Sequence, residues 1–265
     1  KPGNDLMKKC IVEQSCGLGD ILLSSKIGCH YASLGYEVIW PVEMIYKNLS
    51  NNITTKMPIK YPHVHDFYDG KSSYEKLSRT NISEVTEIDN VLYLPLRRGF
   101  HSNHGKKMQQ SYGSDECNMF AKFGMCGLNY DNWQNYFSIT RNYEKESELE
   151  KLLGVSGDVD IHLVNREFGT PPRWRELLKR DIETPKGLKR LEMKIVDGYD
   201  IFDWIGIFEK SKKIDTVTTS NFYIFEKIDL SCIPTIYSKN NNHRTFEENF
   251  GWKQKLASKE YEYIS

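Results

Sequence analysis

The sequence has no apolar run that approaches the ~20 residues of a membrane-spanning helix, and we expect no membrane span in its 265 residues. Residues 1–5 are polar and lack the apolar core of a signal peptide. An excess of one charge is also missing, since 36 Lys and Arg residues balance 36 Asp and Glu residues. A general nucleic-acid-binding protein normally carries a basic excess. Nucleic-acid binding is therefore not expected.

Paired cysteines are missing as well. None of the six cysteines lies in a Cys-x-x-Cys pair, so in a chain of this length we expect reduced thiols that are mostly buried. The predicted compartment is the cytoplasm. His63 and His65 would share one face of a strand, but a metal site needs at least a third ligand that the sequence does not indicate. No metal is predicted.

The amino-terminal region predicts a strand, a glycine turn, a helix and a second strand. The mostly apolar residues 8–15 run into the Gly17, Leu18 and Gly19 turn, Asp20 opens a helical pattern, and residues 36–40 form the next strand. Parallel strands joined through a helix make a βαβ unit. The region therefore predicts a parallel sheet in an α/β fold.

The rest of the chain repeats this alternation after residues 156–158, which are interpreted as a linker. An apolar strand at 90–96 and helices at 117–137 and 144–153 precede the linker. The second set of elements comprises strands at 159–164, 191–196, 214–217 and 232–237 and helices at 200–210 and 222–228. We predict a first domain over 1–155, a second over 156–240, and a partly helical tail over 241–265 that returns to the first domain.

Asp20 has two interpretations that the residues alone leave open. It is either a simple helix cap or a base that deprotonates a bound hydroxyl. Gly17 and Gly19 allow a ligand to approach the backbone closely. The turn is not a dinucleotide fingerprint, because Leu22 stands where the third glycine is required.

Three further polar turns follow the carboxyl ends of predicted parallel strands, where ligands bind in open α/β sheets. Hydroxyls and helix N–H groups suit a pyrophosphate in the turn with Thr218, Thr219, Ser220 and Asn221. Arginine matches phosphate geometry in the turn with Asn165, Arg166, Thr170 and Arg173. An acceptor, or a donor phosphate, suits the basic turn with Arg97, Arg98, His101 and His104. The alternatives are an ordinary capped helix, a solvated loop and a basic surface loop, respectively.

Residues 15–22 and 35–40 resemble the opening of the heptosyltransferase-like GT-B glycosyltransferases, which begin with a strand, a small-residue turn carrying Leu-Gly-Asp, and a helix. The resemblance implies two Rossmann-like domains with a cleft between them, and Asp20 as the catalytic base. The turn at 218–221 is similar in place to the family's donor-phosphate turn, although the family's Asp-Thr-Gly and following His are missing. Residues 119–133, 164–172 and 201–221 also resemble small glycosyltransferase-like proteins of large DNA viruses and bacteria.

The predicted function is an inverting, metal-independent transfer of a sugar from a nucleotide sugar to a glycan hydroxyl. No cofactor is implied beyond this co-substrate, and a UDP-sugar is preferred only because such donors are common. One alternative is an S-adenosylmethionine-dependent methyltransferase that uses Glu13, Gly17 and Gly19, with Glu43 as the ribose-binding acid. That alternative leaves the second α/β half without a role. The other alternative is a sugar- or nucleotide-binding protein without turnover.

Overall fold

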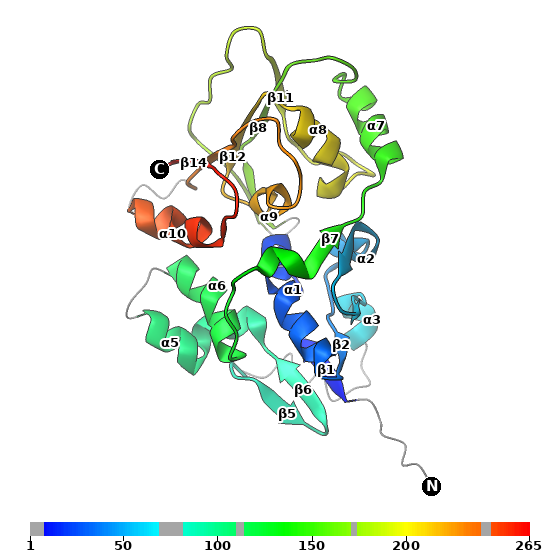
Figure 1. The fold of residues 1–265 in the computed structure, drawn as a ribbon, viewed down its shortest axis with the longest axis vertical. Helices are drawn as coiled ribbons and strands as arrows, with labels where there is room; N and C mark the ends of the chain where they lie inside the picture. The colour runs from blue at the N-terminus through cyan, green and yellow to red at the C-terminus, as the bar shows by residue number, and fades with distance from the viewer. Residues whose placement is uncertain (1–7, 69–81, 110–113, 171–173, 240–244) are drawn as a thin grey trace. The chain divides into compact units, whose positions relative to one another are not determined.

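The chain divides into two compact units, Lys1–Ser138 and Ile139–Ser265. The computed structural model describes residues 8–68, 82–109, 114–170, 174–239 and 245–265 (Figure 1). The division falls before the boundary expected at 155, because helix α7 (Tyr143–Leu152) packs on helix α8 (Ile205–Lys210). Arg141 supports this packing, since its Nη1 donates to Oε2 of Glu209 over 2.6 Å.

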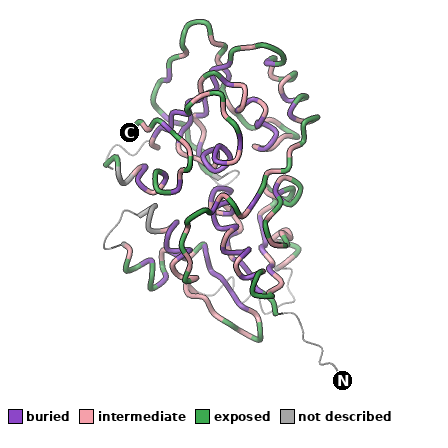
Figure 2. Tube along the Cα trace, in the orientation of Figure 1, coloured by how far each residue is buried: buried purple, intermediate pink, exposed green. Residues whose placement is uncertain are grey.

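The first unit is built on a five-stranded sheet in the order β4-β2-β1-β6-β5. Its strands are β1 (Lys9–Val12), β2 (Glu37–Ile39), β4 (Ile59–Lys60), β5 (Thr86–Ile88) and β6 (Val91–Leu94). Strand β1 pairs in parallel with β2 and β6, and only β5 runs antiparallel to its neighbour. A strand covered on both faces reads as a short apolar run, which explains why β1 lies at the centre. Its last three residues are fully buried (Figure 2).

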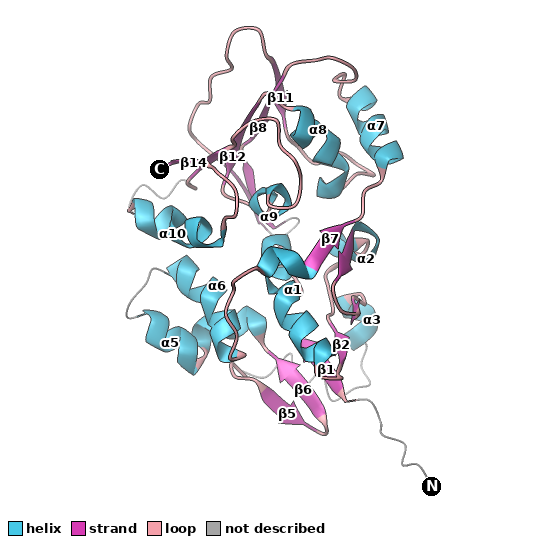
Figure 3. Ribbon diagram, viewed as in Figure 1, coloured by secondary structure: helices cyan, strands magenta, loops and turns pink. Residues whose placement is uncertain are grey.

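The predicted βαβ unit is confirmed, with shorter strands than the sequence indicated. Helix α1 (Leu18–Ser33) joins β1 to β2, and the chain leaves β1 at Val12 rather than at residue 15. The short helix expected at 43–49 is the 3-10 turn η1 (Met44–Tyr46) followed by α2 (Leu49–Asn52). The remaining elements of this unit are β3 (Ile53–Thr55), α3 (Val64–Tyr68), η2 (Leu96–His101), α5 (Asn103–Gln109), α6 (Ser114–Met125) and η3 (Trp133–Tyr136), and β3 pairs with β7 (Phe137–Ile139) (Figure 3).

The second unit is built on a wholly parallel five-stranded sheet in the order β11-β8-β12-β13-β14. Its strands are β8 (Ile161–Asn165), β11 (Lys189–Glu192), β12 (Lys213–Val217), β13 (Thr235–Tyr237) and β14 (Glu262–Ile264), and the hairpin β9 (Glu167–Thr170) and β10 (Trp174–Leu177) lies outside the sheet. Its other elements are η4 (Ile201–Trp204), α9 (Asn221–Phe225) and α10 (Phe246–Leu256). The tail, expected to return to the first domain, thus adds β14 to the second sheet.

The expected fold class, α/β with two Rossmann-like units, is confirmed by these two sheets. Among the described residues no helix is long and apolar enough to cross a membrane. Five cysteines in the described residues are free thiols, of which Cys10 and Cys29 are buried.

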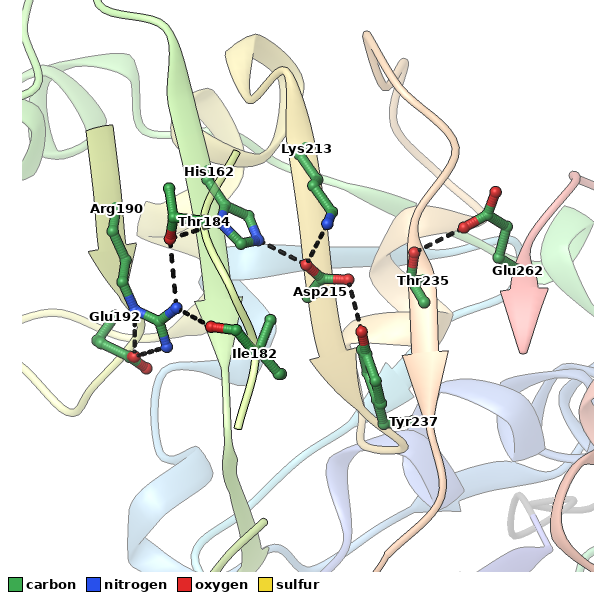
Figure 4. A network of polar contacts seen from close by, with 10 residues as sticks. All are labelled: His162, Ile182, Thr184, Arg190, Glu192, Lys213, Asp215, Thr235, Tyr237 and Glu262. Atoms are coloured by element: carbon green, nitrogen blue, oxygen red, sulfur yellow. Dashed lines mark hydrogen bonds and ion pairs between the residues drawn. The ribbon is translucent and has the colours of Figure 1, made fainter. Parts of the chain in front are cut away.

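One face of the second sheet carries a buried polar network (Figure 4). Oδ2 of Asp215 lies 2.5 Å from Nε2 of His162, and neither side chain is exposed. The Nζ of Lys213 lies 3.2 Å from the same oxygen. The hydroxyl of Tyr237 donates to Oδ1 of Asp215 over 3.2 Å, so both carboxylate oxygens have partners.

Irregular chain, rather than a helix, contributes the side chains that close over this network. Nδ1 of His162 lies 3.0 Å from the hydroxyl of Thr184. Leu178 and Ile182 pack with Val164, Val217 and Tyr237 in one buried cluster. The segment that follows β10 therefore covers His162 and Asp215, whose side chains are unexposed, while the side chain of Lys213 is 36% exposed.

Asp215 remains charged in this interior. Burial raises the pKa of Asp215, but hydrogen bonds from His162 and Lys213 outweigh burial and hold this pKa below its ordinary value. A carboxyl group whose pKa is lower in the folded state stabilises the fold above its unfolded pKa and loses that contribution as the pH falls.

We expect Asp215→Ala to lower the free energy of unfolding by about 3–5 kcal/mol at neutral pH, because it leaves buried donors without their anion. The loss should shrink as the pH falls below about 4, because the carboxyl group of the unfolded wild-type chain then takes up a proton before the folded one does, and the contribution of Asp215 to stability declines. Urea unfolding at several pH values measures both effects. Asp229→Asn, at an exposed carboxylate of the same unit, is the control and should change stability by less than about 0.5 kcal/mol. A loss independent of pH would contradict this account of Asp215.

Candidate functional site

The first sheet has a topological switch point between β1 and β6. From β1 the chain proceeds to β2 and β4 on one side and later to β6 and β5 on the other. Ligands of open α/β sheets bind outside the carboxyl ends of the strands at such a point. The two segments that leave it are joined, since Glu13 N donates to Leu94 O and Arg97 N donates to Glu13 O, both over 2.9 Å.

Asp20 lies at this switch point, in the first turn of α1. Gly17 precedes the helix with a φ of 79° and has no side chain to cap it. The carboxylate folds back over Gly17, where an ideal Cβ would lie 2.7 Å from Oδ2 of Asp20. Asp20 is therefore not the helix cap that one interpretation expected. A carboxylate in the first turn is still favoured by the helix dipole.

A buried lysine holds one oxygen of Asp20. Lys122, on α6, forms an ion pair with Oδ1 of Asp20, and the side chains of Lys122 and Asp20 are 1% and 28% exposed. The Nζ of Lys122 also donates to Oε1 of Gln14 over 2.9 Å. Within the described residues Oδ2 of Asp20 has no hydrogen-bond partner. Asp20 thus has one anchored oxygen and one open oxygen.

The sequence interpretation missed Lys122 and Gln14. The available signal was a lysine between Ala121 and Phe123, inside an apolar stretch of helix, because lysine is almost never fully buried without a partner. Gln14 donates through Nε2 to Cys16 O over 2.5 Å and is 4% exposed. Its side chain therefore links the turn after β1 to the lysine.

Tyr46 occupies the amino terminus of α1. The backbone N–H groups of Leu18 and Gly17 form hydrogen bonds to its hydroxyl, and burial raises the pKa of Tyr46 to about 12. These are the groups that would otherwise receive an anion. Together with the charge of Asp20, the tyrosine disfavours a phosphate at Gly17 and Gly19, both predicted to bind the donor.

The predicted acceptor residues follow β6 on η2 and α5. Arg97 and His101 are exposed and Arg98 is half-buried. His104 is exposed on α5, and its ring lies against Gly124 of α6, where an ideal Cβ would be 2.0 Å from Nε2. The structure thus brings these side chains to the same end of the sheet as Asp20.

Glu13, the acid of the methyltransferase alternative, lies at this edge and is half-buried. Burial raises the pKa of Glu13, while the charges of Arg98 and Arg97 oppose the shift. The carboxylate is thus associated with the basic turn after β6 rather than with the glycine turn.

The second sheet has its own switch point, between β8 and β12. Counted in chain order its strands run 2-1-3-4-5, an arrangement that places ligands between the first and third strands. Asn165 ends β8 and Asn221 begins α9 after β12. Their Nδ2 groups donate to the hydroxyl of Thr216 over 3.1 and 3.3 Å. The structure therefore joins these two predicted donor-binding residues through Thr216.

The other residues predicted to bind the donor differ in their exposure and in their contacts. Thr218, Thr219 and Ser220 are half-buried directly after β12. Arg166 donates from Nε and Nη2 to Leu178 O over 3.2 and 2.8 Å, so part of its guanidinium fastens the segment after β10. The side chain of Thr170 and all of Arg173 lie outside the described residues.

Lys253 is a second buried lysine that the sequence interpretation missed. It lies on α10, is 1% exposed, and its Nζ donates to Thr219 O over 3.4 Å. The rings of Phe222 and Trp252 lie 4.7 and 4.8 Å from Nζ. Burial, with a smaller effect of Lys239, holds the pKa of Lys253 well below its ordinary value. The hydrogen bond from this amine to Thr219 O therefore stabilises the turn after β12.

A histidine pair and an Asp-x-Asp triplet are the two candidate metal sites. The rings of His63 and His65 lie 5.1 Å apart, but no group of three or more His, Cys, Asp or Glu side chains suited to a metal occurs in the described parts of the chain. The prediction that no metal is bound overlooked the Asp-x-Asp triplet, a common metal–nucleotide clasp, at Asp158 and Asp160. Both residues are exposed and precede β8, at the strand end opposite the switch-point edge.

Comparisons with known proteins find little. No family model matches the sequence, and no curated protein matches it. The chain is similar in structure to the glycosyl transferase family 9 from Veillonella parvula DSM 2008. The two are 9% identical with a TM-score of 0.46, over 89% of this chain and 83% of that chain. A likeness at this level carries no argument about function, which depends on the residues of this chain.

We expect Gly17→Ala to destabilise the protein by more than Gly35→Ala, as urea unfolding would measure. Both glycines have a positive φ, 79° and 89°, which costs an alanine about 1–2 kcal/mol. Only the Gly17 substitution also forces the Asp20 carboxylate to move, because nothing lies within 4 Å of a Cβ at Gly35. Equal losses would show that the carboxylate does not depend on Gly17.

Proposed function

We propose that the protein is an inverting glycosyltransferase that transfers a sugar from a nucleotide sugar to a hydroxyl of a glycan. The observation that carries the proposal is the state of Asp20. Its carboxylate stands at a switch-point edge, with Oδ1 paired to Lys122 and Oδ2 without a partner among the described residues. A general base must offer an open oxygen within hydrogen-bond reach of the proton that it accepts.

The proposed reaction is a direct displacement. Oδ2 of Asp20 accepts the proton of the acceptor hydroxyl while that oxygen forms a bond to the anomeric carbon. The bond between the anomeric carbon and the diphosphate oxygen breaks, and the nucleoside diphosphate leaves with its electron pair. Attack opposite the leaving group inverts the anomeric centre. Arg97, Arg98, His101 and His104 are the proposed acceptor contacts.

The proposed donor contacts lie at the switch point of the second sheet. Thr218, Thr219 and Ser220 supply hydroxyl groups after β12 and Arg166 supplies a guanidinium group, while Arg173, which is proposed for the same role, lies outside the described residues. Preorganised donors of this kind stabilise a leaving diphosphate without a metal ion, and we propose that transfer is metal-independent. Asn165 and Asn221 act by fixing the turn through Thr216.

The methyltransferase alternative fits the site less well. An S-adenosylmethionine loop relies on the free N–H groups of its glycine turn, whereas Tyr46 accepts from Gly17 and Leu18 here. That alternative also leaves the polar turns of the second sheet without a ligand. A binding protein without turnover could use the open oxygen of Asp20 to accept a hydrogen bond from a ligand hydroxyl, so the two functions differ in whether Asp20→Asn removes turnover while leaving binding intact.

We expect Asp20→Asn to lower kcat by about 10²–10⁴-fold, the usual contribution of a general base. Asparagine keeps an oxygen toward Lys122, whereas alanine would leave the buried ammonium without its anion and destabilise the fold. Asp66→Asn, at an exposed carboxylate of the same unit, is the matched control and should keep wild-type turnover. Wild-type kcat in Asp20→Asn would remove Asp20 from the mechanism.

We expect one nucleoside diphosphate to raise the melting temperature in EDTA, when UDP, GDP, ADP, CMP and S-adenosylhomocysteine are compared. A ligand at 100 times its Kd that binds only the folded state adds about 2.7 kcal/mol. Asp20→Asn should show the same increase in melting temperature, because the Asp20 carboxylate is proposed to act on the acceptor rather than on the donor. Stabilisation by S-adenosylhomocysteine alone would favour the methyltransferase instead.

A further inference from the structure

Lys122 is a buried lysine in an otherwise apolar stretch of helix α6. Its side chain is 1% exposed, on a helix whose neighbouring residues Met119, Phe120, Ala121 and Phe123 are all buried. Replacing a buried ion by an apolar side chain of similar volume is often neutral or stabilising. Stability of α6 alone therefore does not explain why an ammonium group is kept here.

The contacts of Lys122 are directed toward one oxygen of one residue. Its Nζ meets Oδ1 of Asp20 and, over 2.9 Å, Oε1 of Gln14. Gln14 is itself fixed, because its Nε2 donates to Cys16 O over 2.5 Å. The ammonium is thus held by a second acceptor besides Asp20, and its position does not depend on the carboxylate alone.

Glycine backbone lies close to both ends of the ion pair between Lys122 and Asp20. Gly99 of η2 lies so close to α6 that an ideal Cβ would be 3.2 Å from both the backbone N and the Cγ of Lys122. At the other end of the ion pair, the missing side chain of Gly17 leaves room for Oδ2 of Asp20. Two glycines on different segments therefore accommodate the two ends of the ion pair.

We propose that Lys122 is a positioning residue for Asp20, and this inference rests on the proposed function. With Gln14, it fixes Oδ1 and leaves Oδ2 as the oxygen that accepts the acceptor proton. Lys122 touches neither substrate in this role and acts only through Asp20.

Lys122→Met tests the role, because methionine keeps the length of the side chain and removes the charge. The Asp20 carboxylate can be solvated in this variant, since its side chain is 28% exposed, so we expect the protein to fold. We expect kcat to fall at least tenfold while the KM for the donor stays within twofold of wild type. A fall in kcat at an unchanged donor KM is a change that a merely structural role would not cause.

Three other variants complete the design. Lys122→Arg keeps the charge and should recover part of kcat. Gln14→Met removes the second contact of the ammonium and should lower kcat by less, in the same direction. Lys60→Met breaks the ion pair with Glu37, in which the lysine side chain is 70% exposed, and should behave as wild type. These variants keep the test open if Lys122→Met does not fold.

The outcomes separate this inference from the proposed function. If Asp20→Asn is inactive and Lys122→Met has the wild-type kcat, the role of Lys122 is overturned and the function stands. If the wild type shows no sugar transfer, ¹³C NMR of labelled aspartate still tests the contact. The Asp20 carboxyl signal should change its chemical shift in Lys122→Met and not in Lys60→Met, and an unchanged signal would overturn the role.

Discussion

The candidate site of the first unit depends on one ion pair, between Asp20 and the buried Lys122. Asp20 follows β1 and Lys122 lies on α6, which follows β6, so the pair ties together the two segments that leave the switch point. An ammonium that is 1% exposed is costly without a partner. Gln14 supplies a second acceptor for the ammonium, and Gly17 and Gly99 leave room at the two ends of the pair.

The second unit contains a buried aspartate with a different surrounding, and the contrast separates structure from function. Asp215 is unexposed and both of its oxygens have partners, from His162, Lys213 and Tyr237. Such a carboxylate can hold a sheet together but cannot accept a proton from a ligand. Asp20 has one fixed oxygen and one open oxygen, which is a poor arrangement for stability and a good one for chemistry.

Local signals predicted the parts of the fold that are encoded within a few residues. The βαβ unit at 8–40 and the alternation after residue 158 follow from periodicity and glycine positions, and both are confirmed. Lys122 was not predictable as a partner of Asp20, because the two are 102 residues apart and only tertiary packing brings them together. The same holds for Arg141, whose contact with Glu209 assigns residues 139–155 to the second unit, and for the pairing of β14 with β13.

The ion pair also limits the chemistry that Asp20 can perform. With Oδ1 paired to Lys122, the proton must be accepted by Oδ2. A carboxylate is in general a far weaker base than a sugar alkoxide, so it does not ionise a free hydroxyl beforehand. It can accept the proton as the attacking oxygen bonds to the anomeric carbon and the hydroxyl becomes more acidic. On the proposed function, proton transfer therefore accompanies bond formation at carbon. Most of the barrier must then be lowered at the leaving diphosphate, by the turn after β12 that Lys253 supports.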